Sequence, residues 1–154
     1  MINKILSKFI ITLQKLLPIS FKINHKFQNH NQVTNLDIII TSLKNKNFEP
    51  EYVVDVGCFK GIWTNKLLKF FPNSKYILFD ADDKNIEYLD KLKFNYKNVD
   101  YKIKLLSDDE KEYDFFSMAS GSSIFEEQTN YSREIKKIKS SLLYNELPNE
   151  IKNT

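Results

Sequence analysis

The 154-residue sequence contains few of the residue types that build metal sites and covalent cross-links. Its single cysteine excludes an internal disulfide and a cysteine-rich zinc site, and a reducing cytoplasm is the simplest compartment. Two histidines leave few ligands for a catalytic metal, and we expect no metal. There are only three glycines and four prolines, while 42% of the residues are hydrophobic, which argues against a disordered or low-complexity chain. Length and apolar content together predict one globular domain.

Long hydrophobic runs are also missing. No stretch approaches the roughly 18 apolar residues of a membrane-spanning helix. The apolar run at residues 9–14 ends at Lys15. A signal peptide needs an unbroken apolar stretch of about 7 to 15 residues and a small-residue cleavage site, so none is expected. The sequence therefore predicts a cytoplasmic protein.

Positive charge is concentrated in an N-terminal arm, because residues 1–36 carry five lysines and no acidic residue. Within residues 1–23 the apolar residues follow the spacing of an amphipathic helix that ends at Pro18. They are Ile2, Ile5, Leu6, Phe9, Ile10, Leu13, Leu16 and Leu17. A basic helix of this kind binds either the inner face of a membrane, peripherally, or one edge of its own domain, and the second interpretation is favoured. The rest of the chain is slightly acidic and lacks a basic patch interleaved with aromatics, which argues against a nucleic-acid partner.

The pattern after the arm predicts an α/β fold. Residues 24–35 are polar and predict a linker, so that residues 36–154 form the main domain. The run at 52–56 is short, apolar and β-branched, which is typical of a strand buried on both faces of a parallel sheet. Further strands are expected at 75–80, 99–107, 112–118 and 135–141, with helices at 36–46, 62–71 and 82–95 and a helical turn at 142–147. This alternation predicts a Rossmann-like, doubly wound and mostly parallel sheet that binds its ligand at the carboxyl ends of the strands.

Gly57 and Gly61 lie four residues apart, between the first expected strand and the following helix. Such a turn places backbone N–H groups at a helix N-terminus, where an anionic group is stabilised. A dinucleotide site requires a glycine where this sequence has Phe59, and no Gly-Lys-Ser/Thr run indicates a P-loop. The amino-acid end of S-adenosylmethionine needs only modest room at such a turn. Asp55, at the end of the strand, is placed to pair with its ammonium group.

Two more acidic residues follow the next strands. Asp80 lies 23 residues after Gly57, close to the spacing at which Rossmann-like sites hold a ribose diol with a carboxylate. Asp108, at the end of the third expected strand, is placed to accept a hydrogen bond from an adenine amino group. Each acid alone is equally well explained as a helix cap. Three acids at three successive strand ends beside one glycine turn favour a nucleoside site.

At these positions the sequence resembles the FkbM-type S-adenosylmethionine-dependent methyltransferases. The first motif of that family, D-V-G-A-x-x-G followed by an aromatic or apolar pair and Thr, is similar to residues 55–64, DVGCFKGIWT. The family's Phe-Glu-Pro at the end of its second strand is similar to FDA at 79–81, and LSD at 106–108 and GSS at 121–123 resemble later elements. The resemblance covers roughly residues 36–147. It implies S-adenosylmethionine as the cofactor, with binding residues Asp55, Gly57, Cys58, Phe59, Gly61, Thr64, Asp80, Ala81, Ser107 and Asp108.

The resemblance also implies an activity, the O-methylation of a glycan or another small hydroxylated acceptor. In the family a segment resembling D-x-x-K-x-D-x-x-G-x-E follows and supplies much of the acceptor side. Because the sequence stops at Thr154, before such a segment, we expect an incomplete, N-terminal portion of the enzyme. A non-catalytic remnant or a cofactor-binding subunit is the alternative. No catalytic base is assigned: His25 and His30 lie in the linker, and Ser122 and Ser123 either orient an acceptor or bond their own backbone.

Overall fold

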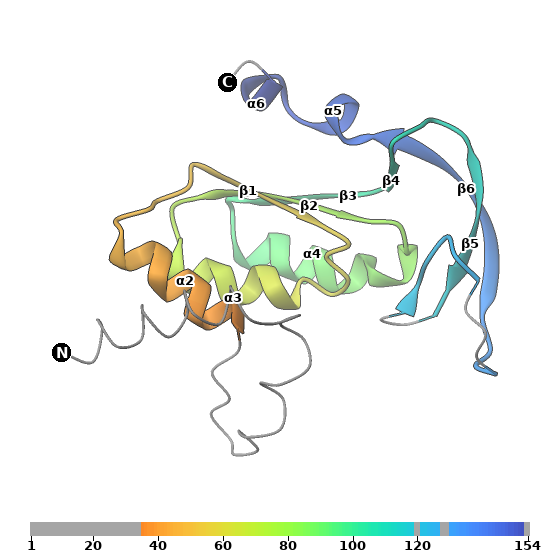
Figure 1. Cartoon of the computed structure of the whole chain (residues 1–154), viewed down its shortest axis with the longest axis horizontal. Helices are drawn as coiled ribbons and strands as arrows, with labels where there is room; N and C mark the ends of the chain where they lie inside the picture. The colour runs from red at the N-terminus through yellow and green to blue at the C-terminus, as the bar shows by residue number, and fades with distance from the viewer. Residues whose placement is uncertain (1–34, 119–120, 127–129, 153–154) are drawn as a thin grey trace, which may run out of the picture. The chain divides into compact units, whose positions relative to one another are not determined.

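The computed structural model describes residues 35–118, 121–126 and 130–152 of the chain (Figure 1). The amphipathic helix expected in residues 1–23, and all but the last residue of the expected linker, lie outside these ranges. The chain divides into two compact units, Met1–Phe48 and Glu49–Thr154. The first contains helix α2 (Asn35–Asn45), close to the expected bounds. In the part of the chain that the structure describes, no helix is both long and apolar enough to cross a membrane.

A parallel three-stranded sheet forms the centre of the second unit, and its strand order is β1-β2-β3. Its strands are β1 (Tyr52–Val56), β2 (Lys75–Asp80) and β3 (Val99–Ile103), connected by α3 (Ile62–Phe70), the short 3-10 helix η1 (Asp83–Asn85) and α4 (Ile86–Asn95). The predicted α/β fold with a mostly parallel sheet is confirmed to this extent. The parallel register pairs Val56 with Phe79, so β1 and β2 finish at the same edge of the sheet.

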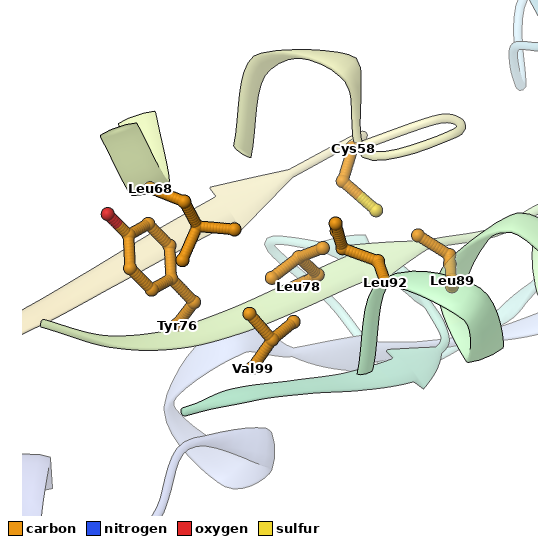
Figure 2. Packing of buried hydrophobic residues seen from close by; sticks show 7 residues of the cluster. All are labelled: Cys58, Leu68, Tyr76, Leu78, Leu89, Leu92 and Val99. Carbon is orange, nitrogen blue, oxygen red and sulfur yellow. The ribbon is translucent and has the colours of Figure 1, made fainter. Parts of the chain in front are cut away.

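The hydrophobic core lies where α3 and α4 pack on one face of this sheet (Figures 1 and 2). Its buried members are Cys58, Leu68, Tyr76, Leu78, Leu89, Leu92 and Val99. Helical spacing puts Leu89 and Leu92 on the same side of α4, toward the sheet. The Tyr76 hydroxyl donates to the carbonyl of Phe71 at 2.9 Å, which satisfies a polar group inside the core. Burial raises the pKa of Tyr76 to about 12.

β1 is not buried on both faces, so that expectation was wrong. Val54 and Val56 are 37% and 55% exposed, because β1 lies at the edge of the sheet. β2 is the strand with two buried faces, and Tyr76 to Asp80 are all buried within it. Both strands have short apolar sequences. Their place in the strand order, which the sequence does not contain, decides which of them is covered.

The single strand expected at 99–107 is in fact two strands that belong to different sheets. Pairing with β2 stops at Ile103, because β2 itself ends at Asp80. There the N–H of Lys104 donates to the Asp80 carbonyl at 2.7 Å. The chain then enters β4 (Leu105–Ser107).

A second three-stranded sheet has the order β4-β6-β5. β5 (Glu112–Ser117) runs antiparallel to β6 (Glu134–Leu142), and β4 runs parallel to β6. Figure 1 shows this sheet beside the ends at which β2 and β3 finish. It therefore lies near the edge of the first sheet where a ligand was expected.

The chain continues through two short helices, α5 (Leu143–Glu146) and α6 (Asn149–Lys152). The helical turn predicted at 142–147 is confirmed by α5. The Glu146 carboxylate lies 3.1 Å from the Lys102 ammonium nitrogen and 3.5 Å from that of Lys104. These two ion pairs connect α5 to β3 and to the residue that follows β3.

Candidate functional site

The turn between β1 and α3 has a backbone that depends on its glycines. Gly57 and Gly61 have φ angles of +72° and +70°, in the left-handed region that glycine adopts at little cost. A Cβ atom added to Gly57 would meet no atom within 4 Å, whereas one added to Gly61 would lie 2.7 Å from Cδ2 of Leu92. Gly57 therefore borders open space, and Gly61 allows the turn to lie close to the side chain of Leu92 in α4.

Most N–H groups of this turn are used inside the protein. Those of Gly57 and Cys58 both donate to the carbonyl of Phe79, at 2.9 and 3.0 Å. The N–H of Phe59 donates to Oδ2 of Asp80 at 2.6 Å, and that of Gly61 donates to the Cys58 carbonyl. These four N–H groups are therefore already bonded, and the N–H groups predicted for an anion at the helix N-terminus have to belong to α3 itself.

The first turn of α3 provides the N–H groups that remain. Its N-cap is Gly61, which has no side chain to cap the helix. The first helical bond runs from the N–H of Asn65 to the carbonyl of Gly61, so the N–H groups of residues 62–64 precede the intrahelical ladder. Trp63 lies in this turn, half-exposed, with the Lys66 ammonium 5.5 Å from the centre of its ring. An anionic group is stabilised at such a helix start.

Asp55 is held at the end of β1 by a residue of α3. Its Oδ2 accepts a hydrogen bond of 2.6 Å from the hydroxyl of Thr64, which is completely buried. The structure thus joins two of the residues that the motif predicted. The bond fixes the carboxylate through one oxygen, and within the described residues the other oxygen accepts no hydrogen bond.

Asp80, at the end of β2, is 8% exposed and already accepts three hydrogen bonds. The N–H of Phe59 reaches Oδ2, while the N–H of Asp82 and the side-chain amide of Asn85 reach Oδ1 at 2.8 and 3.1 Å. Burial raises the pKa of Asp80, although these three donors oppose the shift. A carboxylate offers about four acceptor positions, so about one remains for a ligand.

Asp82 is a part of this region whose wider role the sequence did not indicate. It stands at the first position of the helix expected at 82–95, where an aspartate is a common helix cap, and its Oδ1 accepts from the N–H of Lys84 at the start of η1. Its Oδ2 accepts from the hydroxyls of Ser117 and Ser122 at 2.6 and 2.9 Å. These partners lie 35 and 40 residues further along the chain, so no local pattern relates them to Asp82.

The remaining predicted residues lie apart from these contacts. Ser107 is in β4, and its hydroxyl lies 3.1 Å from the exposed carboxylate of Asp108. Asp108 therefore follows a strand of the second sheet, not a third strand of the first, and the expected row of three acids along one sheet was wrong in that respect. Ala81 follows Asp80 directly and is half-buried.

Cys58 is part of the core, with 1% of its surface exposed. Burial, and then the charges of Asp80 and Asp55, raise the pKa of its thiol above the ordinary value. The thiol therefore stays protonated where a free cysteine ionises.

We expect iodoacetamide to alkylate Cys58 at least about 100-fold more slowly in the native protein than in urea, because the reagent needs an exposed thiolate. Mass spectrometry of timed samples in mildly alkaline buffer measures both rates. Because Cys58 is the only cysteine, the label reports one position. Equal rates would show that the glycine turn is open in solution.

Two surface hollows of about 600 Å³ each lie at the opposite edge of the sheet. One is lined by the end of α4 and the other by the first residues of the three strands, and neither contains a predicted site residue. Over the ranges that the structure describes, no three histidine, cysteine, aspartate or glutamate side chains are grouped to hold a metal. His25 and His30 lie outside those ranges.

Comparison with known proteins adds no assignment. The sequence matches no protein-family model, and no curated protein is similar to it at a significant level.

Proposed function

We propose that this protein is an S-adenosylmethionine-dependent methyltransferase of the FkbM type that methylates a hydroxyl group of a glycan or another small acceptor. The observation that carries the proposal is the 2.6 Å hydrogen bond between the N–H of Phe59 and the Asp80 carboxylate. It holds the glycine turn and the end of β2 together beside the open space at Gly57. The Rossmann-like, doubly wound character of the fold is part of the same proposal.

The amino-acid end of the cofactor fits the groups between β1 and α3. Its carboxylate matches the uncapped first turn of α3, where three N–H groups precede the helical ladder. Its ammonium group matches Asp55, because Thr64 orients that carboxylate through one oxygen and leaves the other to accept. When bound, S-adenosylmethionine supplies an activated methyl group, and the residues of the chain supply binding and orientation.

The ribose fits less completely than the sequence suggested. Both hydroxyls of a diol were expected on Asp80, but three of about four acceptor positions of that carboxylate are already used. One hydroxyl fits the remaining position. A contact with both hydroxyls requires the N–H of Phe59 to move away from Oδ2.

Isothermal titration calorimetry with S-adenosylhomocysteine and S-adenosylmethionine tests the proposal. We expect both to bind, and we expect Asp55→Asn to weaken both by about tenfold or more, since a charge-assisted hydrogen bond is worth about 1.5 to 3 kcal/mol. Adenosine has no ammonium group, so its affinity should be the same for wild type and Asp55→Asn. If neither S-adenosylhomocysteine nor S-adenosylmethionine binds, the proposal is overturned.

A matched control is Asp90→Asn. Asp90 is an exposed aspartate of α4 that accepts a hydrogen bond from Tyr101, away from the glycine turn. We expect this variant to bind both compounds like the wild type. Equal weakening by both substitutions would show a general effect of charge and no specific contact at Asp55.

A further inference from the structure

Asp82 is a buried carboxylate, 3% exposed, with several donors around it. Removing a carboxylate from water is costly unless hydrogen bonds replace those of the solvent. Here two serine hydroxyls and the N–H of Lys84 meet it. Burial raises the pKa of Asp82, but hydrogen bonds from Ser117, the Lys84 N–H and Ser122 outweigh that effect, so the pKa lies below its ordinary value. Asp82 is therefore ionised at neutral pH.

The segment that Asp82 holds is a closed loop, which we call the serine loop (residues 117–118 and 121–123). Phe116 and Ser123 exchange two backbone hydrogen bonds across its base, at 2.8 and 3.1 Å. Inside the loop, the N–H of Gly121 donates to the Met118 carbonyl at 2.7 Å. The N–H of Met118 donates to the hydroxyl oxygen of Ser122, which in turn donates to Asp82. Hydrogen bonds thus connect the described residues of the loop to one another, and Asp82 holds them through Ser117 and Ser122.

Asp82 also connects the serine loop to the candidate nucleoside contact. Its backbone N–H donates to Oδ1 of Asp80 at 2.8 Å, and Oδ2 of Asp80 accepts from Phe59. A continuous series of hydrogen bonds therefore runs from the serine loop through Asp82 and Asp80 to the glycine turn. The three segments come from distant parts of the chain and meet at the end of β2.

We propose that Asp82 is a positioning residue for the nucleoside site, which holds the serine loop beside Asp80 so that the loop forms one wall of the site. The inference rests on the proposed function, because it takes Asp80 to contact the ribose. Asp82 acts through the loop and through the orientation of Asp80, and it makes no contact with the reacting atoms. Ser122 then has a defined role, since its hydroxyl is used to fix the loop and not to orient an acceptor.

Affinities of four variants for S-adenosylhomocysteine and adenosine test this role. We expect Asp82→Ala and Ser122→Ala each to lower the affinity for both ligands by about fivefold or more, because both variants remove the hydrogen bond that holds the serine loop to Asp82. The double variant should bind no more weakly than Asp82→Ala, since residues that act as one unit are not additive. Asp82→Asn keeps one acceptor oxygen, so its affinity for both ligands should lie between those of wild type and Asp82→Ala. This variant provides the test if Asp82→Ala does not fold.

Ser123→Ala is the matched control. The Ser123 hydroxyl belongs to the same loop but accepts from the N–H of Phe125 at 3.0 Å, and Asp82 accepts from Ser117 and Ser122 instead. We expect the affinity of Ser123→Ala to stay within about twofold of wild type, because substitutions at sites that share no partner act independently. A weakening equal to that of Ser122→Ala would overturn the assignment to Asp82.

Amide hydrogen exchange distinguishes a positioning role of Asp82 from a purely structural role. In the wild type, saturating S-adenosylhomocysteine should slow exchange at the N–H groups of Met118 and Ser123, and in Asp82→Asn this protection should be reduced. A purely structural Asp82 would change exchange equally with and without ligand, which would overturn the inference. If the wild type binds no ligand, the proposed function and this inference both fail. If it binds and the Asp82 and Ser122 variants bind equally well, only this inference fails.

Discussion

Replacing Gly61 with alanine is expected to lower the free energy of unfolding by roughly 2 to 4 kcal/mol, the sum of a backbone and a packing cost. The backbone cost arises because φ is +70°, where a side chain is disfavoured by about 1 to 2 kcal/mol. The packing cost arises because the new Cβ would lie 2.7 Å from Cδ2 of Leu92, a core residue of α4. Urea denaturation followed by circular dichroism measures the change.

Gly57→Ala is the matched control for this substitution. Its φ angle of +72° is nearly the same, but its Cβ would meet no atom within 4 Å. We therefore expect a loss of only about 1 to 2 kcal/mol, from the backbone alone. The difference between the two variants measures the close contact of Gly61 with Leu92 of α4. Equal losses would mean that Leu92 moves aside at no cost.

Replacing Asp80 with alanine is the second substitution with a large expected effect. It leaves the N–H groups of Phe59 and Asp82 and the amide of Asn85 without their acceptor in a buried place. Each unsatisfied buried donor costs about 1 to 3 kcal/mol, so we expect a loss of roughly 3 kcal/mol or more. Calorimetry at a temperature where the variant is still folded should detect no binding of S-adenosylhomocysteine.

The control for Asp80→Ala is Asp108→Ala, which removes an exposed carboxylate whose hydrogen bond comes from the neighbouring Ser107. Surface substitutions of this kind change stability by about 0.5 kcal/mol or less. Any effect of Asp108→Ala on affinity then measures its predicted contact with adenine without a change in the fold. A large loss of stability in this variant would contradict the peripheral position of Asp108.

The stability difference between wild type and Asp80→Ala should also depend on pH. Because burial raises the pKa of Asp80 above 3.8, the folded protein takes up a proton there before the unfolded chain does. Uptake of that proton favours the folded state of the wild type as the pH falls from neutrality through the raised pKa. The variant lacks this group and gains nothing from the proton. The wild type should therefore exceed the variant in free energy of unfolding by a growing amount as the pH falls through that interval. A difference that narrows would mean that the ionised form is favoured by folding.

Local signals predicted most of the elements, because each depends on neighbouring residues. The helix expected at 62–71 is α3, which begins after Gly61 and stops before Pro72. The strand expected at 75–80 is β2. What the sequence did not reveal depends on partners far along the chain. The edge position of β1 and the break at Lys104 follow from strand order and from the end of β2.

The candidate site divides in the same way. Asp55 and Thr64 are nine residues apart within one strand-turn-helix unit, and their contact follows from a local motif. The meeting of Phe59 with Asp80 follows from the geometry of two adjacent parallel strands. The attachment of Ser117 to Asp82 requires the second sheet to place β5 beside the end of β2, and no spacing in the sequence encodes that arrangement.

Trp63 is an intrinsic fluorescent probe of the glycine turn and the start of α3. It is the only tryptophan in the chain, it lies two residues after Gly61, and half of its surface faces solvent near the Lys66 ammonium. Its fluorescence therefore responds to the start of α3, while far-ultraviolet circular dichroism responds to both sheets. A change in emission on adding a ligand, with an unchanged dichroism spectrum, would report an event at the glycine turn rather than a change of fold.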